Sequence, residues 1–277
     1  MLTLSQQHLL KLAQSSERAG DLESAISNLE EAVLTAKSTE LVTELARLYR
    51  QNKQGLLAYH TIKALPDYLT GDALTEYWNI LAANHFFIEA MELAASDAKL
   101  AAPASVNVAP VSVSRQEIII KQYHNVGLVE ENYLQVLQLD FKHFMLLVQS
   151  YLLDPNANFA IRLSLVEECV RLRLETPLQV LILDQLKTVV PSQLPLMYQS
   201  AQYQTILAAA LAQIAKSPSQ RPLVLSCVNL IVGSLYPDLS QIDDSAAFAS
   251  AIVSYVTDHT AGRYEQLFSQ IMQHIHE

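Results

Sequence analysis

The chain has 277 residues, a formal net charge of −10, an apolar share of 51% and only 6 glycines. Its length suggests two domains, and its low glycine content argues against all-β sandwiches and nucleotide-cradling loops, which rely on positive φ angles. The acidic excess is shared evenly between the two halves without a cluster of Lys and Arg, which argues against nucleic-acid binding. We therefore expect a mostly helical protein.

The N-terminus predicts no export. Residues 1–8 lack the basic region and apolar core of a secretory signal. Two uncharged stretches could suggest membrane spans, but residues 188–215 contain two prolines and residues 222–237 are too short. Cys169 and Cys227 both lie in apolar helical patterns, as expected for reduced core thiols. We expect a cytoplasmic protein that does not bind membranes.

A repeat runs through the first hundred residues. Residues 20–25, 53–58 and 85–90 align, and they place Ala25, Ala58 and Ala90 at spacings of 33 and 32 residues. Each alanine opens a second helix, and each is preceded by a first helix with apolar residues at matching positions. Asp21, Ser38 or Thr39, and Asp72 are suited to cap helices in the three units. An ordinary helical bundle is the alternative, because isolated alanines at this spacing also occur by chance.

This pattern resembles the tetratricopeptide repeat, in which small residues let two antiparallel helices approach closely. Ala13, Ala25, Ala46 and Ala58 fill the small positions of the first two units. The third unit departs from the pattern because Trp78 stands in a small position, and Lys37 stands where a proline would close the first unit. The resemblance implies an array of helical hairpins over residues 1–100 whose first helices line a concave binding surface.

The repeat register also predicts which side chains face that surface. They are Gln14 and Arg18 in unit one, Thr43, Arg47 and Arg50 in unit two, and Asp72, Thr75, Glu76 and Asn79 in unit three. Arg47 and Arg50 are i, i+3 neighbours and are expected to grip an acidic group together. Each of these residues has the alternative of being simply an exposed polar side chain.

One class of ligand is disfavoured by the same register. Chaperone-binding members of the tetratricopeptide family hold a peptide's terminal carboxylate with Lys, Asn and Arg at set positions. The corresponding positions here hold Leu10, Gln14, Glu44, Asp72 and Glu76. The clamp is missing, and the acidic residues would repel a carboxylate.

Residues 101–114 carry no charge, two prolines and no helical period, which predicts a linker. Ser114 to Glu117 reads as a capping box before a new domain over residues 115–277. An apolar face predicts a helix from Phe141 to Leu152. A further helix places Ile161, Leu165, Cys169 and Leu172 on its buried side and leaves Arg162, Glu167, Arg171 and Arg173 to solvent.

The segment near 178–190 is short, bounded by Pro177 and Pro191, and β-branched towards its end, which predicts a small β-hairpin. A further buried helix is the competing interpretation. Helices are predicted near 193–215, 219–235, 245–258 and 262–275. The fold class is thus all-α: an array of hairpins followed by an α-helical C-terminal domain with one hairpin of strands.

The second half resembles the C-terminal region of a family of bacterial tetratricopeptide-containing proteins without established activity. The similar features are residues 151–155 before a helix, the 178–191 segment, and residues 235–237 before a final helical pair. This resemblance implies an architecture and no site.

Residues with catalytic or metal-binding spacing do not stand out. The chain lacks Gly-x-Ser-x-Gly, its eight histidines show no repeated ligand spacing, and its acidic pairs diverge on helices. We expect no cofactor, no metal and no enzyme. The leading hypothesis is an adaptor that binds a protein segment, or another copy of this chain, through the hairpin array, with the C-terminal domain supplying a second surface. The alternatives are a peptide-sensing regulatory protein and an enzyme whose site is assembled in the C-terminal domain.

Overall fold

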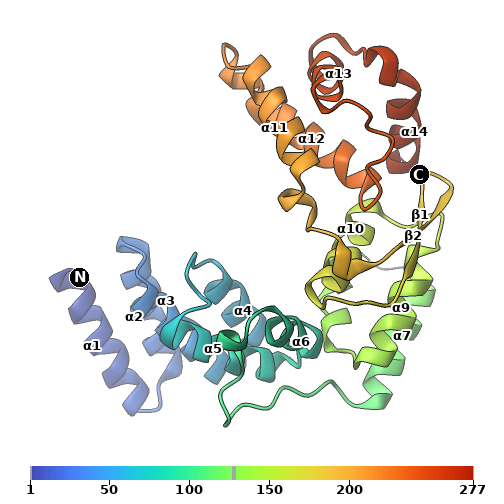
Figure 1. Cartoon of the computed structure of the whole chain (residues 1–277). Coiled ribbons are helices and arrows are strands. Elements are labelled where there is room, and N and C mark those ends of the chain that lie inside the picture. The colour runs from blue at the N-terminus through green and yellow to red at the C-terminus, as the bar shows by residue number, and fades with distance from the viewer. Residues whose placement is uncertain (1, 127–128, 277) are drawn as a thin grey trace. The chain divides into compact units, whose positions relative to one another are not determined.

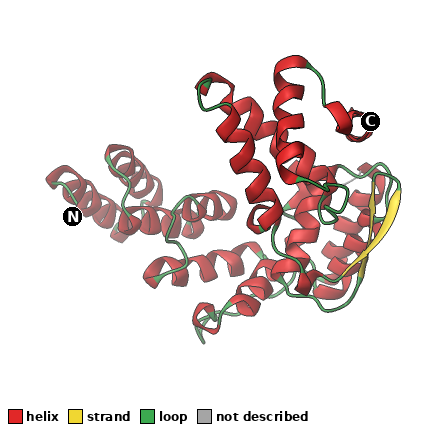
Figure 2. Ribbon diagram, turned by 45° about the horizontal axis from the view of Figure 1, so that its top comes forward, coloured by secondary structure: helices red, strands yellow, loops and turns green. Residues whose placement is uncertain are grey.

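The computed structural model describes residues 2–126 and 129–276 and is mostly helical, with one small antiparallel sheet (Figures 1 and 2). This confirms the prediction of an all-α fold with a short β-hairpin. The chain forms two compact units. The first comprises Met1–Lys121 and Leu134–Phe141, and the second comprises Gln122–Tyr133 and Lys142–Glu277.

The first unit is built from helices joined by short loops: α1 (Leu4–Arg18), α2 (Leu22–Thr35), α3 (Thr39–Gln51), α4 (Gly55–Lys63), α5 (Gly71–Asn84) and α6 (Phe87–Ser96). They pack in pairs, α1 with α2, α3 with α4 and α5 with α6, and α3 also packs on α5. Ala25 and Ala58 are both 0% exposed, so the helix axes approach closely at these positions.

Two of the predicted helix caps are confirmed. Asp21 accepts a hydrogen bond from the Ser24 amide at 3.0 Å, and Ser38 accepts one from the Leu41 amide at 3.3 Å. The prediction for Asp72 is wrong, because α5 begins at Gly71 and Asp72 lies inside its first turn. An aspartate there still interacts favourably with the positive end of the helix dipole.

The uncharged segment after α6 packs against the first unit. The His85 Nδ1 lies 3.1 Å from the Ala109 carbonyl oxygen, and the Val111 amide donates to the Gln138 carbonyl at 3.0 Å. Residues 101–112 therefore belong to the first unit.

The predicted capping box at Ser114 is wrong, because α7 (Val113–Val126) starts before it. The Gln116 amide instead bonds the Ser112 carbonyl at 3.0 Å, and the Gln116 side chain reaches the Val111 carbonyl at 2.9 Å. With these bonds the helix begins at Val113, two residues earlier than a Ser114 cap would place its start.

The second unit contains α8 (Glu130–Tyr133), α9 (Phe141–Leu152), α10 (Phe159–Arg171), β1 (Leu178–Ile182), β2 (Gln185–Val189), α11 (Ala201–Gln213), α12 (Arg221–Leu235), α13 (Ser245–Asp258) and α14 (Glu265–His276). The predicted start of α11 near 193 is corrected to Ala201. Pro191 and Pro195 cannot donate the amide bonds of a continuous helix, and Ser200 caps α11 by accepting from the Tyr203 amide at 3.2 Å.

The strands form a tight hairpin, visible as the two arrows of Figure 2. Leu183 and Asp184 make the turn with φ angles of 46° and 62°, which match a type I′ turn. Leu178, Val180 and Ile182 alternate towards the core and are at most 2% exposed.

The hairpin explains one wrong prediction. Arg162 on α10 was expected in solvent but is 8% exposed. Its guanidinium donates to the Leu181 carbonyl at 3.2 Å and to the Ser234 carbonyl, in the last turn of α12, at 2.5 Å. Burial lowers the pKa of Arg162 to about 10. The arginine is thus covered by elements distant in sequence, which the local helical period does not reveal.

Neither Cys169 nor Cys227 forms a disulfide; Cys169 is buried as predicted, whereas Cys227 is only partly buried. Burial raises the pKa of the Cys227 thiol, which keeps it protonated. Across the described residues, the helices fall short of the length and apolar character needed to cross a membrane.

Candidate functional site

A depression of about 450 Å³ runs across the first helices of the three hairpins. It is lined by residues of α1, α3 and α5 and by the residue that precedes α5: Leu10, Gln14, Thr39, Glu40, Thr43, Glu44, Thr70, Gly71, Asp72 and Ala73. We call this set the first-helix groove. An adjoining depression of about 550 Å³ shares Leu10, Gln14 and Glu40 with it and extends past Lys11 towards Leu2.

Three predicted residues, Gln14, Thr43 and Asp72, are brought together in the groove. They come from three different helices. Arg18 and Thr75 are exposed but line neither depression.

Arg47 is engaged within the chain. Its two terminal nitrogens each lie 2.7 Å from an oxygen of Glu17 on α1, and it also bonds Glu44 at 2.8 and 2.5 Å. The hydrogen bonds that Arg47 donates to Glu44 and Glu17 raise the pKa of Arg47, and its guanidinium lowers the pKa of Glu17. This bidentate arrangement joins α1 to α3.

Arg50 is held in the same way on the other side of α3. It bonds both oxygens of Glu76 on α5, at 2.6 and 3.0 Å. Asn79 donates to the same carboxylate at 3.4 Å, and Glu76 is 6% exposed. The arginine pair expected to grip a ligand instead links the three first helices to one another.

The charge that remains uncommitted in the groove is negative. Glu40 and Asp72 are exposed and make no side-chain hydrogen bond or ion pair with any described residue, and the same holds for the side chain of Gln14. The Thr43 hydroxyl oxygen is buried and has no hydrogen-bond partner among the described residues. Buried polar atoms are normally satisfied, so a partner from outside the chain or a water is expected there.

Sequence reasoning missed Thr39, Glu40 and Thr70 as groove residues. A signal was available for the first two, because Thr39 and Glu40 precede Thr43 by four and three residues and such positions share a helix face. Thr70 lies just outside a helix, where the repeat register does not apply.

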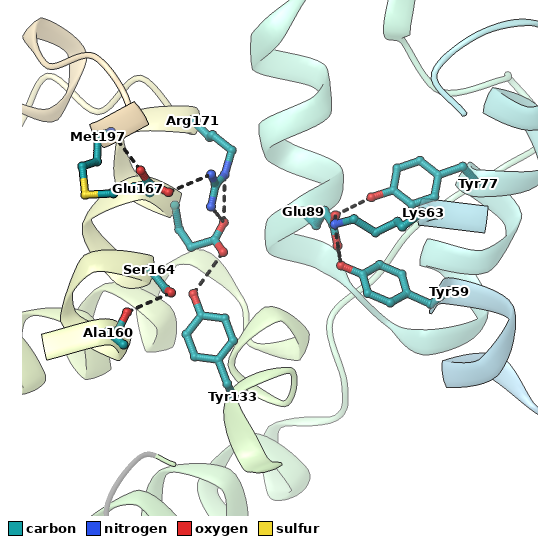
Figure 3. A network of polar contacts seen from close by, with 11 residues as sticks. Tyr59, Lys63, Tyr77, Glu89, Tyr133, Ala160, Ser164, Glu167, Arg171 and Met197 are labelled. Carbon is teal, nitrogen blue, oxygen red and sulfur yellow. Dashed lines mark hydrogen bonds and ion pairs between the residues drawn. The ribbon is translucent and has the colours of Figure 1, made fainter. Parts of the chain in front are cut away.

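Two buried polar networks have a structural role (Figure 3). In the first unit, Glu89 of α6 accepts hydrogen bonds from Tyr59 at 2.7 Å, from Lys63 at 2.7 Å and from Tyr77. The network ties α6 to α4 and α5, and Glu89 is only 8% exposed.

The other network belongs to the second unit. Glu168 accepts from Tyr133 at 3.0 Å and lies 3.2 Å from Arg171, while Glu167 accepts from the Met197 amide at 2.9 Å. Glu167 was expected in solvent, yet it anchors the segment before α11. These carboxylates are engaged in holding elements of the unit together.

The second unit has two depressions lined by polar side chains. One, of about 380 Å³, contains Tyr236, whose hydroxyl donates to the Pro195 carbonyl at 2.8 Å. The other, of about 390 Å³, contains Asp243, which accepts from Arg263 at 3.1 Å and from Tyr264 at 2.5 Å. The Tyr264 hydroxyl lowers the pKa of Asp243. The Tyr236 hydroxyl and the Asp243 carboxylate are thus both hydrogen bonded within the second unit.

Within residues 2–126 and 129–276, no three His, Cys, Asp or Glu side chains are grouped so that they could hold a metal ion. Comparison of the chain with protein-family models, with curated proteins and with solved structures found no match.

Proposed function

We propose that this protein is a helical-repeat binding protein whose first-helix groove takes an extended, positively charged segment of a partner protein. The observation that carries the proposal is a depression crossing α1, α3 and α5 in which Gln14, Glu40 and Asp72 have no partner within the described chain. A segment lying across the groove would meet all three helices.

The sign of the partner's charge follows from how the carboxylates are paired. Glu17, Glu44 and Glu76 are neutralised by Arg47 and Arg50, whereas Glu40 and Asp72 form no ion pair with any residue that the structure describes. Lys or Arg side chains of a partner would form ion pairs with these two carboxylates, and an acidic segment would be repelled. The exposed Gln14 amide supplies hydrogen-bonding groups for the partner's main chain.

The test needs a variant that changes the groove charge and a control with the same effect on its own helix. Glu40→Lys reverses an exposed charge in the first turn of α3. Glu23→Lys does the same in the first turn of α2, outside the groove, and carries the same penalty against the helix dipole. Both variants change the net charge of the protein equally.

A photocrosslinking residue at position 14 of the full chain should capture a partner in the native cell. We expect the Glu40→Lys protein to lose that crosslink and the Glu23→Lys protein to keep it. Asp72→Lys should behave like Glu40→Lys. If Glu40→Lys and Glu23→Lys give the same crosslinks, or if the captured protein is a second copy of this chain, the proposed cationic partner is wrong.

A further inference from the structure

The β-hairpin of the second unit has one covered edge and one open edge. In the register of the hairpin, Ile182 pairs with Gln185 next to the two-residue turn. In such a hairpin that pair is hydrogen bonded, and hydrogen-bonded and non-hydrogen-bonded pairs then alternate along the ladder. The main-chain N–H and C=O groups of Gln179 and Leu181 therefore point out of β1, and those of Leu186 and Thr188 point out of β2.

The contacts of β1 confirm this alternation independently. Gln149 on α9 bonds both main-chain groups of Gln179, accepting from its N–H at 3.4 Å and donating to its C=O at 2.9 Å. Arg162 on α10 donates to the Leu181 carbonyl at 3.2 Å. Three of the four outward groups of β1, the N–H and C=O of Gln179 and the C=O of Leu181, are thus bonded by the body of the second unit.

The outer edge of β2 has no such cover. The main-chain groups of Leu186 and Thr188 bond no other part of the chain that the structure describes. Gln185, Leu186 and Thr188 are all exposed, and Leu186 shows 57% of its surface. Two residues at i and i+2 with free N–H and C=O groups are the template on which a further strand pairs.

We propose that this open edge binds an extended segment of another protein as a third strand, with an acidic residue of that segment opposite Lys187. Lys187 lies between the two free positions, and its ammonium is 2.8 Å from one oxygen of Asp238. An ammonium has three donors, so it can still bond an acceptor on the incoming strand. A carboxylate directly across the strand pair fits this position.

The same residue disfavours a second copy of this chain as the occupant. Two copies could pair their β2 strands antiparallel about a two-fold axis. Leu186 and Thr188 of each copy would both bond the other copy only if that axis passed through the position of Lys187. That register places two lysines directly opposite each other, and neither ammonium offers an acceptor for the donors that the other has left after bonding Asp238. The strand therefore selects a segment of different sequence, with apolar or β-branched residues on either side of the acid.

Proline offers a precise test, because it removes a single N–H and is tolerated at edge positions that face solvent. Thr188→Pro removes an outward N–H and leaves the bonds between β1 and β2 in place. Thr188→Ala removes the same hydroxyl side chain and keeps the N–H, so it is the matched control. Thermal unfolding of both variants would show that the second unit is intact.

The probe is a synthetic peptide, acetyl-Thr-Val-Glu-Val-Thr-amide, titrated into the ¹⁵N-labelled full chain. We expect the amide signals of Leu186 and Thr188 to shift and their hydrogen exchange to slow. Thr188→Pro should weaken binding about tenfold, as expected for one lost main-chain hydrogen bond, while Thr188→Ala should change it by less than about twofold.

Three results would overturn the proposal. The first is a titration in which the Leu186 and Thr188 amides do not respond. The second is equal binding of the peptide with lysine in place of its glutamate, which would remove the acidic partner. The third is concentration-dependent dimerisation of the free chain that Thr188→Pro abolishes, which would make a second copy the occupant.

Discussion

Tyr77→Phe should destabilise the first unit through the loss of one hydroxyl group. Tyr77 is 1% exposed, and its hydroxyl donates to Glu89, which is 8% exposed. Burial and the negative charge of Glu89 raise the pKa of Tyr77, so the hydroxyl remains a donor throughout the neutral range. Phenylalanine keeps the ring and its packing and removes only the donor.

The expected loss of unfolding free energy depends on the hydrogen bonds that Glu89 retains. After the substitution it still accepts from Tyr59 and Lys63, each at 2.7 Å, so the carboxylate is weakened but not isolated. A hydrogen bond to a charged group contributes about 1.5–3 kcal/mol, and we expect a loss of about 2 kcal/mol. Tyr49→Phe is the matched control, because its hydroxyl donates to Glu30 at 2.5 Å and Glu30 is exposed. Water can replace that donor, so the control should lose less than about 1 kcal/mol.

Trp78 makes the measurement specific to the first unit. It is the only tryptophan of the chain, lies in α5 and is 3% exposed. Urea unfolding followed by its fluorescence therefore reports the unit that contains Glu89, even where the second unit unfolds separately. Equal losses in Tyr77→Phe and Tyr49→Phe would refute the idea that burial of the carboxylate sets the strength of this bond.

Three other contacts give separate predictions. Arg47 lowers the pKa of Glu17, so this pair stabilises the fold above the ordinary carboxylate pKa and its contribution is lost as the pH falls through the lowered pKa. Glu17→Gln should thus flatten the acid limb of stability against pH in urea titrations, and parallel curves would contradict this. Arg50→Ala leaves Glu76 without its cation, and we expect the free energy of unfolding of the first unit to fall by about 1–3 kcal/mol, measured by Trp fluorescence. This range is below that for a fully buried pair because Arg50 is partly exposed. A loss within error would show that the pair is not stabilising. Arg162→Ala removes the donors to two buried carbonyls and should lower the stability of the second unit by about 2–4 kcal/mol in thermal unfolding followed by circular dichroism, whereas a change below about 1 kcal/mol would refute the structural role.

Local sequence patterns predicted most of the secondary structure, because helices and hairpins depend largely on neighbouring residues in the sequence. Ala25 and Ala58 mark close helix approaches, and the prolines on either side of the hairpin exclude a long helix there. The position of Arg162 could not be predicted in this way. Its burial depends on β1 and on Ser234, 72 residues away, and helical periodicity carries no information about such contacts.

The pairing of the groove arginines was different, since the sequence held an unused signal. Arg47 bonds Glu17 across 30 residues, and Arg50 bonds Glu76 across 26. Both separations are close to the repeat spacing, so each partner occupies a comparable position on the neighbouring first helix. Carboxylates about one repeat before and after an arginine therefore deserve inspection before the arginine is assigned to a ligand.

This pairing also reverses the inferred chemistry of the groove. Considered alone, Arg47 and Arg50 favour an acidic partner, because two cations lie one turn apart on α3. Each is instead neutralised by partly or fully buried glutamates, and the groove carboxylates that have no partner among the described residues are the exposed Glu40 and Asp72. The charge that a partner meets is the charge left after intramolecular pairing, which is not the same as the sum over residues on the face. The groove therefore favours a cationic segment, although its most conspicuous residues in the sequence are arginines.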